Sequence, residues 1–358
     1  MSGSSLDGLD LVFTELEESG GKWKYEIRHA ETLSYSKEWI EKLRQAPGLP
    51  GIDYLRLHTE YGHFIGEQVN SFIEASNLQH QVQLISSHGH TVFHEPANKM
   101  TAQLGDGAAI AAVTGINVVS DLRSMDIALG GQGAPIVPMG EKLLFSDDAL
   151  LLNLGGIANI SAATPNGYIA FDICPANRVL NMLVADAGQD YDKDGLLAAK
   201  GFVRDEVLAK MNQQPYYTKP FPKSLANNFG TDVIYPLLKQ ANLSVPDALR
   251  TMVEHISIQL TRSTGRLLNT FKDNRPTRML VTGGGAHNLF LMERLKAALR
   301  VMGIALELPD KKVIDYKEAL IMALVGILRW REENTVLHTV TGASRSSIGG
   351  AVWIGQEA

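Results

Sequence analysis

The sequence is poor in cysteine and contains no long hydrophobic run, and both absences restrict where the protein can work. Cys174 is the one cysteine among 358 residues, so no intrachain disulfide can form, which fits a reducing compartment. No apolar stretch is long enough to span a bilayer. The N-terminus carries an early acid, Asp7, and no apolar core segment, so it does not read as a secretory signal. We therefore expect a soluble, cytoplasmic protein.

Clusters of basic residues are missing as well. The net charge is −6 and lysines and arginines are scattered, which disfavours duplex nucleic acid and anionic membrane surfaces as partners. No G-x-x-x-x-G-K-S/T motif occurs, which argues against a P-loop NTPase. The composition, 45% hydrophobic and 20% charged, is that of an ordinary globular protein, and the chain is long enough for about two domains.

The stretch from residue 150 to residue 195 carries the most information. An apolar run, residues 150–154, is interrupted by Gly155 and Gly156, and a second run, residues 157–162, follows at once. Two short apolar runs separated by a glycine pair predict a hairpin. Because glycine has no Cβ, the backbone at its tip can come very close to a ligand.

A third apolar run, residues 168–171, ends on the carboxylate of Asp172. Pro175 suits the first position of a helix, and a helical pattern begins at Asn177. We expect Asp172 at the exit of a strand beside a helix N-terminus, which would favour its ionised form and suit it to act as a base. The alternative is an N-cap aspartate in an ordinary strand–loop–helix turn.

Two further glycine-rich loops are candidates for binding phosphate or nucleotide. The N-terminal loop, residues 2–10 (SGSSLDGLD), can present N–H and hydroxyl groups to phosphates, and an acid there can hold hydrated Mg²⁺. Residues 282–288 (TGGGAHN) join a predicted strand to a predicted helix and could hold a ribose or phosphates. Dinucleotide binding stays open because Glu307 lies at a suitable distance, although the glycines do not follow G-x-G-x-x-G.

Polar residues in other loops are candidates for substrate contact. His88 and His90 suggest a metal pair, but no third ligand with matching spacing occurs, so contact with substrate is favoured. Arg123 could clamp a carboxylate or phosphate, although its glycine-rich surroundings could equally be a crossover between domains. Glu318 near a helix start could serve only the helix dipole.

Taken in order, these motifs resemble anhydro-N-acetylmuramic acid kinases, a family of the actin-like, sugar-kinase and Hsp70 ATPase superfamily. The resemblance covers nearly the whole chain. The matching segments are MSGSSLDGLD (1–10), SHGHTVFHEP (87–96), DLRSMDIALGGQGAPIVP (121–138), NLGGIANIS (153–161), FDICPAN (171–177), YDKDG (191–195) and TGGGAHN (282–288).

The resemblance implies an α/β protein with the two-lobed actin-like ATPase fold, ribonuclease H-like in its lobes, with nucleotide and sugar in the cleft between them. The first lobe would comprise residues 1–122 and 338–358, with one phosphate loop. The second lobe, residues 123–337, would carry the other phosphate loop, the catalytic aspartate and the adenosine loop. A homodimer is compatible with the sequence.

The resemblance also implies an activity: an ATP- and Mg²⁺-dependent kinase that opens 1,6-anhydro-N-acetylmuramic acid with water and phosphorylates O6. The product would be N-acetylmuramic acid 6-phosphate, formed in the recycling of cell-wall sugar. Asp172 would be the general base. The residues facing ATP would be Ser2, Gly3, Ser4, Ser5, Asp7, Gly8, Gly155, Gly156, Gly283, Gly284 and Gly285, with Asp7 holding Mg²⁺ through water. The residues facing the sugar would be His88, Arg123, Asp126, Asn177 and Glu318.

The chain departs from the family pattern at four places. Family members usually have a strand before the MSG motif, so either the true start lies upstream or another element fills the gap. Glycines are usual where Cys174 and Ala176 stand, and a glutamine where His90 stands. Residues 225–230 (LANNFG) replace a segment that usually runs glycine, basic residue, Glu. These differences keep two alternatives open: a nucleotide-binding regulator with weakened catalysis, and a kinase of another hexose.

Overall fold

The computed structural model describes residues 1–3, 6, 8–145, 149–185, 187–221, 223–226, 228–272 and 275–356. The chain divides into two compact units. The first unit is Met1–Leu144 with Tyr316–Ala358, and the second is Phe145–Asp315. The boundaries expected from the sequence, 122/123 and 337/338, both fall inside the first unit, because the helices of residues 124–144 and 317–330 pack there.

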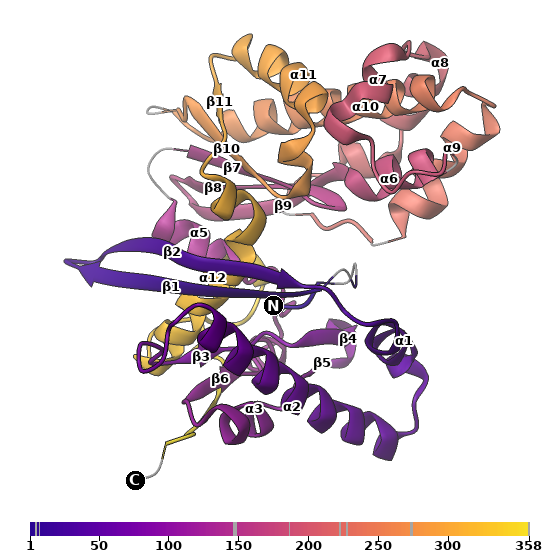
Figure 1. Cartoon of the computed structure of the whole chain (residues 1–358). Coiled ribbons are helices and arrows are strands. Elements are labelled where there is room, and N and C mark those ends of the chain that lie inside the picture. The colour runs from indigo at the N-terminus through magenta and orange to yellow at the C-terminus, as the bar shows by residue number, and fades with distance from the viewer. Residues whose placement is uncertain are drawn as a thin grey trace. The chain divides into compact units, whose positions relative to one another are not determined.

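The second unit is built on one five-stranded sheet (Figure 1). Its strands are β7 (Ala149–Leu154), β8 (Ile157–Thr164), β9 (Gly167–Pro175), β10 (Arg278–Thr282) and β11 (Ala305–Glu307). The order is β11-β10-β7-β8-β9, with β7, β8 and β9 as an antiparallel meander and β10 and β11 parallel to β7. This is the ribonuclease H-like strand order that the resemblance implies.

Helices pack against this sheet and share its hydrophobic core. They are α6 (Asn177–Ala185), α7 (Leu196–Lys200), α8 (Asp205–Asn212), α9 (Tyr235–Gln240), α10 (Val245–Leu268) and α11 (Leu289–Arg300). Short helical turns add η3 (Lys193–Gly195), η4 (Pro215–Thr218), η5 (Gly230–Ile234) and η6 (Gly284–His287). Leu150, Leu151 and Leu152 are all buried, so β7 is covered on both faces, as expected for a central strand.

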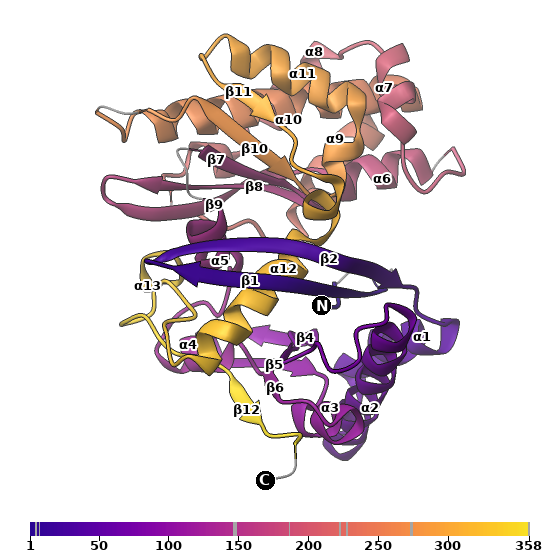
Figure 2. The ribbon, with the colours of Figure 1, turned by 60° about the vertical axis from the view of Figure 1, so that its left-hand side comes forward.

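The strands of the first unit are distributed over three separate sheets (Figure 2). A long hairpin, β1 (Leu9–Ser19) with β2 (Lys22–Leu33), is one sheet. The second joins β12 (Ala351–Trp353), β6 (Val118–Ser120) and β3 (Ile85–Ser86) in that order, and the third is the hairpin of β4 (His90–Glu95) and β5 (Met100–Leu104).

Helices of the first unit pack around these sheets. They are α1 (Lys37–Gln45), α2 (Gly51–Ala75), α3 (Gly107–Thr114), α4 (Ser124–Ala128), α5 (Val137–Leu144) and α13 (His338–Thr341), with the turns η1 (Ala46–Gly48) and η2 (Pro96–Asn98). The helix α12 (Lys311–Trp330) bends at Tyr316 and continues in this unit. Within the described ranges, no helix combines the length and the apolar character that a membrane crossing requires.

A buried ion pair links α5 to α12 inside the first unit. Lys317 Nζ lies 2.6 Å from Glu141 Oε1, and the two side chains are only 4% and 5% exposed. Removing one partner of such a pair leaves the other charge in an environment that cannot solvate it.

We predict that Glu141→Gln lowers the free energy of unfolding by about 3–5 kcal/mol, because Lys317 then loses its buried counter-charge. Glu41→Gln is the matched control: its pair with Arg44 lies at the surface, so the loss should stay below about 1 kcal/mol. Denaturant titration measures both. Equal losses in the two variants would contradict a stabilising role for the buried pair.

Candidate active site

The glycine pair of the second unit forms the tip of the predicted hairpin. Leu154 and Ala158 are the last paired residues of β7 and β8, which confirms that prediction. The N–H of Ala176 donates to Gly156 O at 2.9 Å, and the N–H of Asn177 donates to Gly155 O at 3.1 Å, so the tip is tied to the start of α6. A Cβ at either glycine would meet nothing closer than 3.6 Å, which leaves room for a ligand against bare backbone.

The TGGGAHN turn packs directly on the end of β7. Gly283 has φ +82° and ψ 162°, a conformation open essentially to glycine alone. A Cβ on it would lie 2.7 Å from Asn153 Oδ1, and one on Gly285 would lie 2.7 Å from Leu154 Cβ. Asn177 stands between the two glycine loops, where its Nδ2 donates to Leu154 O at 2.9 Å.

Both loops, together with Asn177, therefore gather at the carboxyl ends of the parallel strands β7 and β10. Ligands of open α/β sheets bind in this position. The predicted strand, turn and helix around TGGGAHN are confirmed as β10, η6 and α11.

Asp172 does not lie at a strand exit, so that expectation is wrong. The ladder with β8 continues past it, since Ile157 still pairs with Pro175, and α6 begins only at Asn177. Proline is tolerated there because it ends the strand. The register shifts at this point: Asn159 pairs with Asp172 and Ala158 with Cys174, so the residue between them is a β-bulge of the kind often found beside active sites.

Burial, not a helix N-terminus, sets the electrostatics of Asp172. It raises the pKa of the carboxyl above the ordinary aspartate value, and the N–H of Leu225, which donates to Oδ2 at 2.8 Å, partly offsets the rise. The backbone is held on both sides, because Asp172 N–H donates to Lys223 O at 3.1 Å and Tyr216 hydroxyl donates to Asp172 O at 2.7 Å. A fixed carboxylate with a raised pKa is a stronger base than an exposed one.

The first unit holds the other predicted site residues. Ser2 is buried, and its hydroxyl accepts from Tyr35 at 2.8 Å and lies 3.0 Å from His90 Nδ1. Tyr35 in turn shares a 2.5 Å hydrogen bond with Tyr61. This network fixes the start of the N-terminal loop, while a contact between Ser2 and phosphate stays a prediction.

The rest of that loop is described only in part. Ser4, Ser5 and Asp7 lie outside the described residues, and with them the expected Mg²⁺ contact. Gly8 lies against the end of β2, where a Cβ would come within 2.6 Å of Leu33 O. No three His, Cys, Asp or Glu side chains within the described ranges come together as metal ligands.

His88, Arg123 and Glu318 form an electrostatically coupled group in the first unit. Burial, reinforced by the charge of Arg123, lowers the pKa of His88 to about 3, so the ring is neutral at pH 7. Burial also lowers the pKa of Arg123 to about 10, against the influence of Glu318. The side chain of Glu318 is exposed at the surface, but the many protein atoms around its carboxyl desolvate it and raise its pKa, an effect that Lys317 and Arg123 oppose.

Two nitrogen atoms of this group have no hydrogen-bond partner in the part of the chain that the structure describes. They are His88 Nε2 and Arg123 Nε, and both are buried. Buried polar atoms are normally satisfied, so these two point to a polar ligand. Asp126, by contrast, has its hydrogen bonds satisfied within the protein. Its side chain is 1% exposed, and its oxygens accept from Gly133 N–H and from the Thr341 hydroxyl, each at 2.7 Å. Its contact with sugar stays a prediction.

Comparison with known proteins places the chain in a family. The model of the family described as anhydro-N-acetylmuramic acid kinase matches residues 1–355. The chain is 34% identical to the anhydro-N-acetylmuramic acid kinase of Vibrio parahaemolyticus, over 96% of this chain and 94% of the relative. It belongs to the anhydro-N-acetylmuramic acid kinase family. As a kinase of that family it uses ATP.

The chain is also similar to other proteins. The anhydro-N-acetylmuramic acid kinase of Shewanella amazonensis is 34% identical, over 98% of this chain and 96% of the relative. Among solved structures, the chain is similar to an activator of the 2-hydroxyisocaproyl-CoA dehydratase from Clostridium difficile with bound ADPNP, at 12% identity and a TM-score of 0.38. That alignment covers 90% of this chain and 96% of the other.

Two of the four departures from the anhydro-N-acetylmuramic acid kinase pattern lie in the unit that carries Asp172. Leu225, the first residue of the LANNFG segment, donates the one hydrogen bond to its carboxylate that the described residues provide. Sequence reasoning missed this contact, because it joins positions 53 residues apart and carries no motif. Cys174 and Ala176 are both fully buried in the hydrophobic core of the second unit.

We predict that Gly283→Ala weakens ATP binding about tenfold or more, because alanine strains this backbone by about 1–3 kcal/mol and pushes the turn away from β7. Gly284→Ala should bind ATP with nearly the parent's dissociation constant, since the nearest atom to a Cβ there is Asn177 Nδ2 at 3.7 Å, an ordinary van der Waals contact. Isothermal titration with ATP measures both. If the two variants bind alike, the close approach of Gly283 does not shape the nucleotide site.

Proposed function

We propose that this kinase opens 1,6-anhydro-N-acetylmuramic acid with water and phosphorylates O6 from ATP, giving N-acetylmuramic acid 6-phosphate and ADP. Family membership supports the substrate class. The observation that carries the chemistry is the environment of Asp172: a half-buried carboxylate with a raised pKa, a backbone held by hydrogen bonds, and Leu225 N–H as its one hydrogen-bond donor among the described residues. Such a group can take a proton from water at neutral pH.

The proposed reaction proceeds through one base. Asp172 accepts a proton from a water molecule, whose oxygen attacks the anomeric carbon C1. The bond between C1 and O6 breaks, and O6 takes its electron pair. O6 then attacks the γ-phosphorus of ATP, ADP leaves, and Asp172 later releases its proton to solvent. The same carboxylate therefore generates both the hydrolytic nucleophile and the phosphoryl acceptor.

The glycine loops of the second unit are suited to the nucleotide. Gly155 and Gly156 offer bare backbone to phosphate oxygens, and the Gly283–Gly285 turn offers a surface without side chains to the adenosine side. Mg²⁺ would neutralise phosphate charge during transfer, and it is commonly held by few protein ligands together with water and phosphates. Asp7 is our candidate for that contact.

The group in the first unit is suited to the sugar. A buried guanidinium pairs well with a carboxylate, and N-acetylmuramic acid carries one on its lactyl group, so we assign that contact to Arg123. Neutral His88 can share a hydrogen bond with a sugar hydroxyl through Nε2, and Glu318 can accept one. These contacts would give the two unpartnered nitrogens the partners they lack.

We predict that Asp172→Asn reduces turnover by at least about 100-fold while the dissociation constant for ATP stays within about twofold, because an amide cannot accept the proton of water. Asp190→Asn, at an exposed carboxylate of the same unit, is the control and should remain fully active. Coupled ADP release with the anhydro sugar measures turnover. Near-parental activity of Asp172→Asn would remove the assigned base, and faster phosphorylation of an ordinary hexose would favour the alternative substrate.

We also predict the pH dependence. The base form of Asp172 is lost as pH falls through its pKa, and burial raises that pKa, so the acidic limb of kcat/KM should lie above the ordinary aspartate value near 3.8. Titration of His88 should add no inflection to the kcat/KM profile between pH 5 and 8, since its pKa is about 3. A pH profile of kcat/KM tests both statements; an acidic limb at or below 3.8 would contradict the role of burial.

A further inference from the structure

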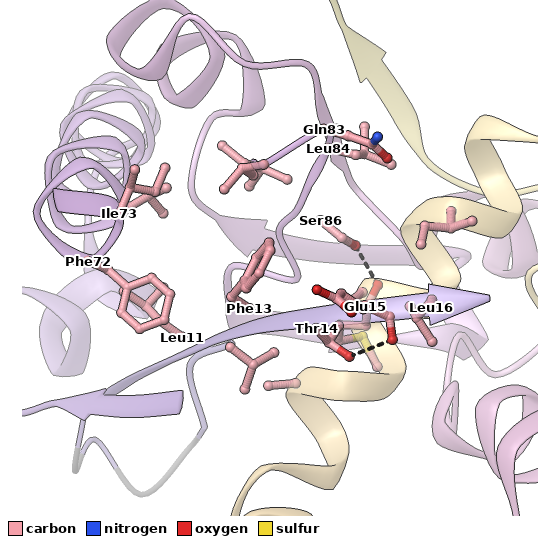
Figure 3. A pocket seen from close by; sticks show the side chains of 18 of the residues that line it. Leu11, Phe13, Thr14, Glu15, Leu16, Phe72, Ile73, Gln83, Leu84 and Ser86 are labelled. Atoms are coloured by element: carbon pink, nitrogen blue, oxygen red, sulfur yellow. Dashed lines mark hydrogen bonds between the residues drawn. The ribbon is translucent and has the colours of Figure 1, made fainter. Parts of the chain in front are cut away.

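A helix in the core of the second unit carries a row of buried polar side chains. This helix is α10, which packs against α7, α8 and β9 (Figure 1). The row contrasts with a cavity of about 490 Å³ in the first unit, whose lining is mainly apolar and includes Leu11, Phe13 and Phe72 (Figure 3). Residues four positions apart share one face of a helix. Four such residues of α10, each at most 7% exposed, form what we call the polar stripe: Asp247, Thr251, His255 and Gln259.

The polar stripe holds α8 at both of its ends. Asp247 accepts from Arg204 Nε at 3.1 Å, and the N–H of Arg204 donates to the Thr251 hydroxyl at 3.1 Å. Arg204 directly precedes α8. At the other end of that helix, Gln259 Nε2 donates to Asn212 Oδ1 at 2.7 Å. Buried polar networks whose members are satisfied favour one arrangement, so α8 is fixed to α10 at both ends.

His255 extends this network to the turn η4. Its Nδ1 lies 2.8 Å from Asn212 Oδ1, an oxygen that can only accept, so Nδ1 carries the proton. Nε2 therefore accepts from the Tyr217 hydroxyl at 2.9 Å. Burial, reinforced by the charge of Arg262, lowers the pKa of His255 to about 3. The ring is thus neutral at pH 7, and both hydrogen bonds keep their direction.

The neighbouring residue of η4, Tyr216, contacts the candidate base. Its hydroxyl donates to Asp172 O at 2.7 Å, and its carbonyl oxygen accepts from Lys223 Nζ at 3.2 Å. Lys223 O in turn accepts from Asp172 N–H at 3.1 Å. Tyr216 is therefore bonded both to the strand that carries the carboxylate and to the segment that pairs with it. Because Tyr216 and Tyr217 are consecutive and both buried, a displacement of one moves the other.

We propose that Tyr217 and His255 are positioning residues for Asp172. Their hydrogen bond fixes η4, and Tyr216 on the same turn transmits that position to the strand that carries the carboxylate. The inference rests on the proposed role of Asp172 as the base. It accounts for a polar network inside a hydrophobic core, because apolar packing tolerates small shifts, whereas a satisfied network favours a single arrangement.

The test is a double-mutant cycle on kcat, measured by coupled ADP release with the anhydro sugar. Tyr217→Phe and Tyr216→Phe each remove one hydroxyl. We expect each to lower kcat about tenfold, because small displacements of a reacting group cost up to about 100-fold. The double variant should also lose about tenfold and not about 100-fold, since Tyr217 acts through Tyr216. The dissociation constant for ATP should stay within about twofold in all three variants. Additive losses would overturn the proposal, because the two hydroxyls would then act independently.

Thr251→Val is the matched control for stability. It also removes a buried hydroxyl with its hydrogen bonds, to Arg204 N–H and Asp247 O, but these do not lead to η4. Its Tm should fall to within about 3 °C of that of Tyr217→Phe, while kcat stays within about twofold of the parent. An equal loss of kcat in Thr251→Val and Tyr217→Phe would overturn the positioning role, because kcat would then follow stability alone.

Two substitutions of His255 test the acceptor itself. His255→Gln should keep most of kcat, because its amide oxygen can still accept from the Tyr217 hydroxyl. His255→Leu offers no acceptor and should lose about tenfold, as Tyr217→Phe does. If His255→Gln loses as much kcat as His255→Leu, the hydrogen bond to Tyr217 does not carry the effect, and the proposal fails.

The acidic limb of kcat/KM gives a readout that stability alone would not move. The titratable groups that interact with the Asp172 carboxyl are Tyr216 from η4 and Cys174 from its own strand. Burial raises the pKa of both, so neither loses its proton near that limb. The neighbouring segment adds the ammonium group of Lys223, whose pKa burial lowers from the ordinary lysine value.

Loosening η4 admits water to the Asp172 carboxyl. Desolvation outweighs the Leu225 hydrogen bond at this group, so its pKa should fall when water enters. The base form then survives to lower pH, and the acidic limb should move to lower pH in Tyr217→Phe but not in Thr251→Val. An unchanged limb in Tyr217→Phe would overturn the proposal.

Asp172→Asn separates this inference from the proposed reaction. If Asp172→Asn is inactive while Tyr217→Phe keeps the parental kcat and acidic limb, the positioning role fails and the base assignment stands. If Asp172→Asn stays active, the base assignment fails, and the positioning role fails with it.

Discussion

The close approach of the Gly283–Gly285 backbone to the end of β7 is the contact on which the site of the second unit depends. It is possible because two Cβ atoms are missing where each would come within 2.7 Å of β7 atoms. Asn177 then bonds to Leu154 O, and the N-terminus of α6 holds the hairpin tip at Gly155. The same meander carries Asp172 on its outer strand, so the two glycine loops and the candidate base are attached to one sheet.

The two units build their candidate sites by different physical means. In the second unit, bare backbone and glycine turns provide the surface, and one carboxylate is held within a ladder. In the first unit, charged and aromatic side chains are desolvated together: His88 stays neutral, Arg123 binds its proton less tightly, and Glu318 binds its proton more tightly. A backbone surface suits a phosphate chain, whereas unpartnered nitrogens suit a polar ligand with fixed hydroxyl and carboxylate groups.

Local features could be predicted from the sequence, and cross-strand features could not. The glycine-tipped hairpin and the TGGGAHN turn follow from short-range patterns, and both are confirmed. The prediction that Asp172 lies at a strand exit is wrong, because the ladder between β8 and β9 extends the strand through Pro175. Pairing with a neighbouring strand leaves no local signal in the sequence. The hydrogen bond from Leu225 likewise joins residues far apart in the sequence and leaves no local signal. The same holds for the ion pair between Lys317 and Glu141, which links α12 to α5 within the first unit.

The single thiol of the chain has a practical consequence. Cys174 is fully enclosed by the core of the second unit, and burial raises its pKa, so little reactive thiolate exists in the native state. Alkylating reagents would reach it only after that core opens, which makes its labelling rate an intrinsic gauge of unfolding in this unit. For the same reason, a cysteine introduced at the surface could be labelled with a spectroscopic probe without first replacing Cys174.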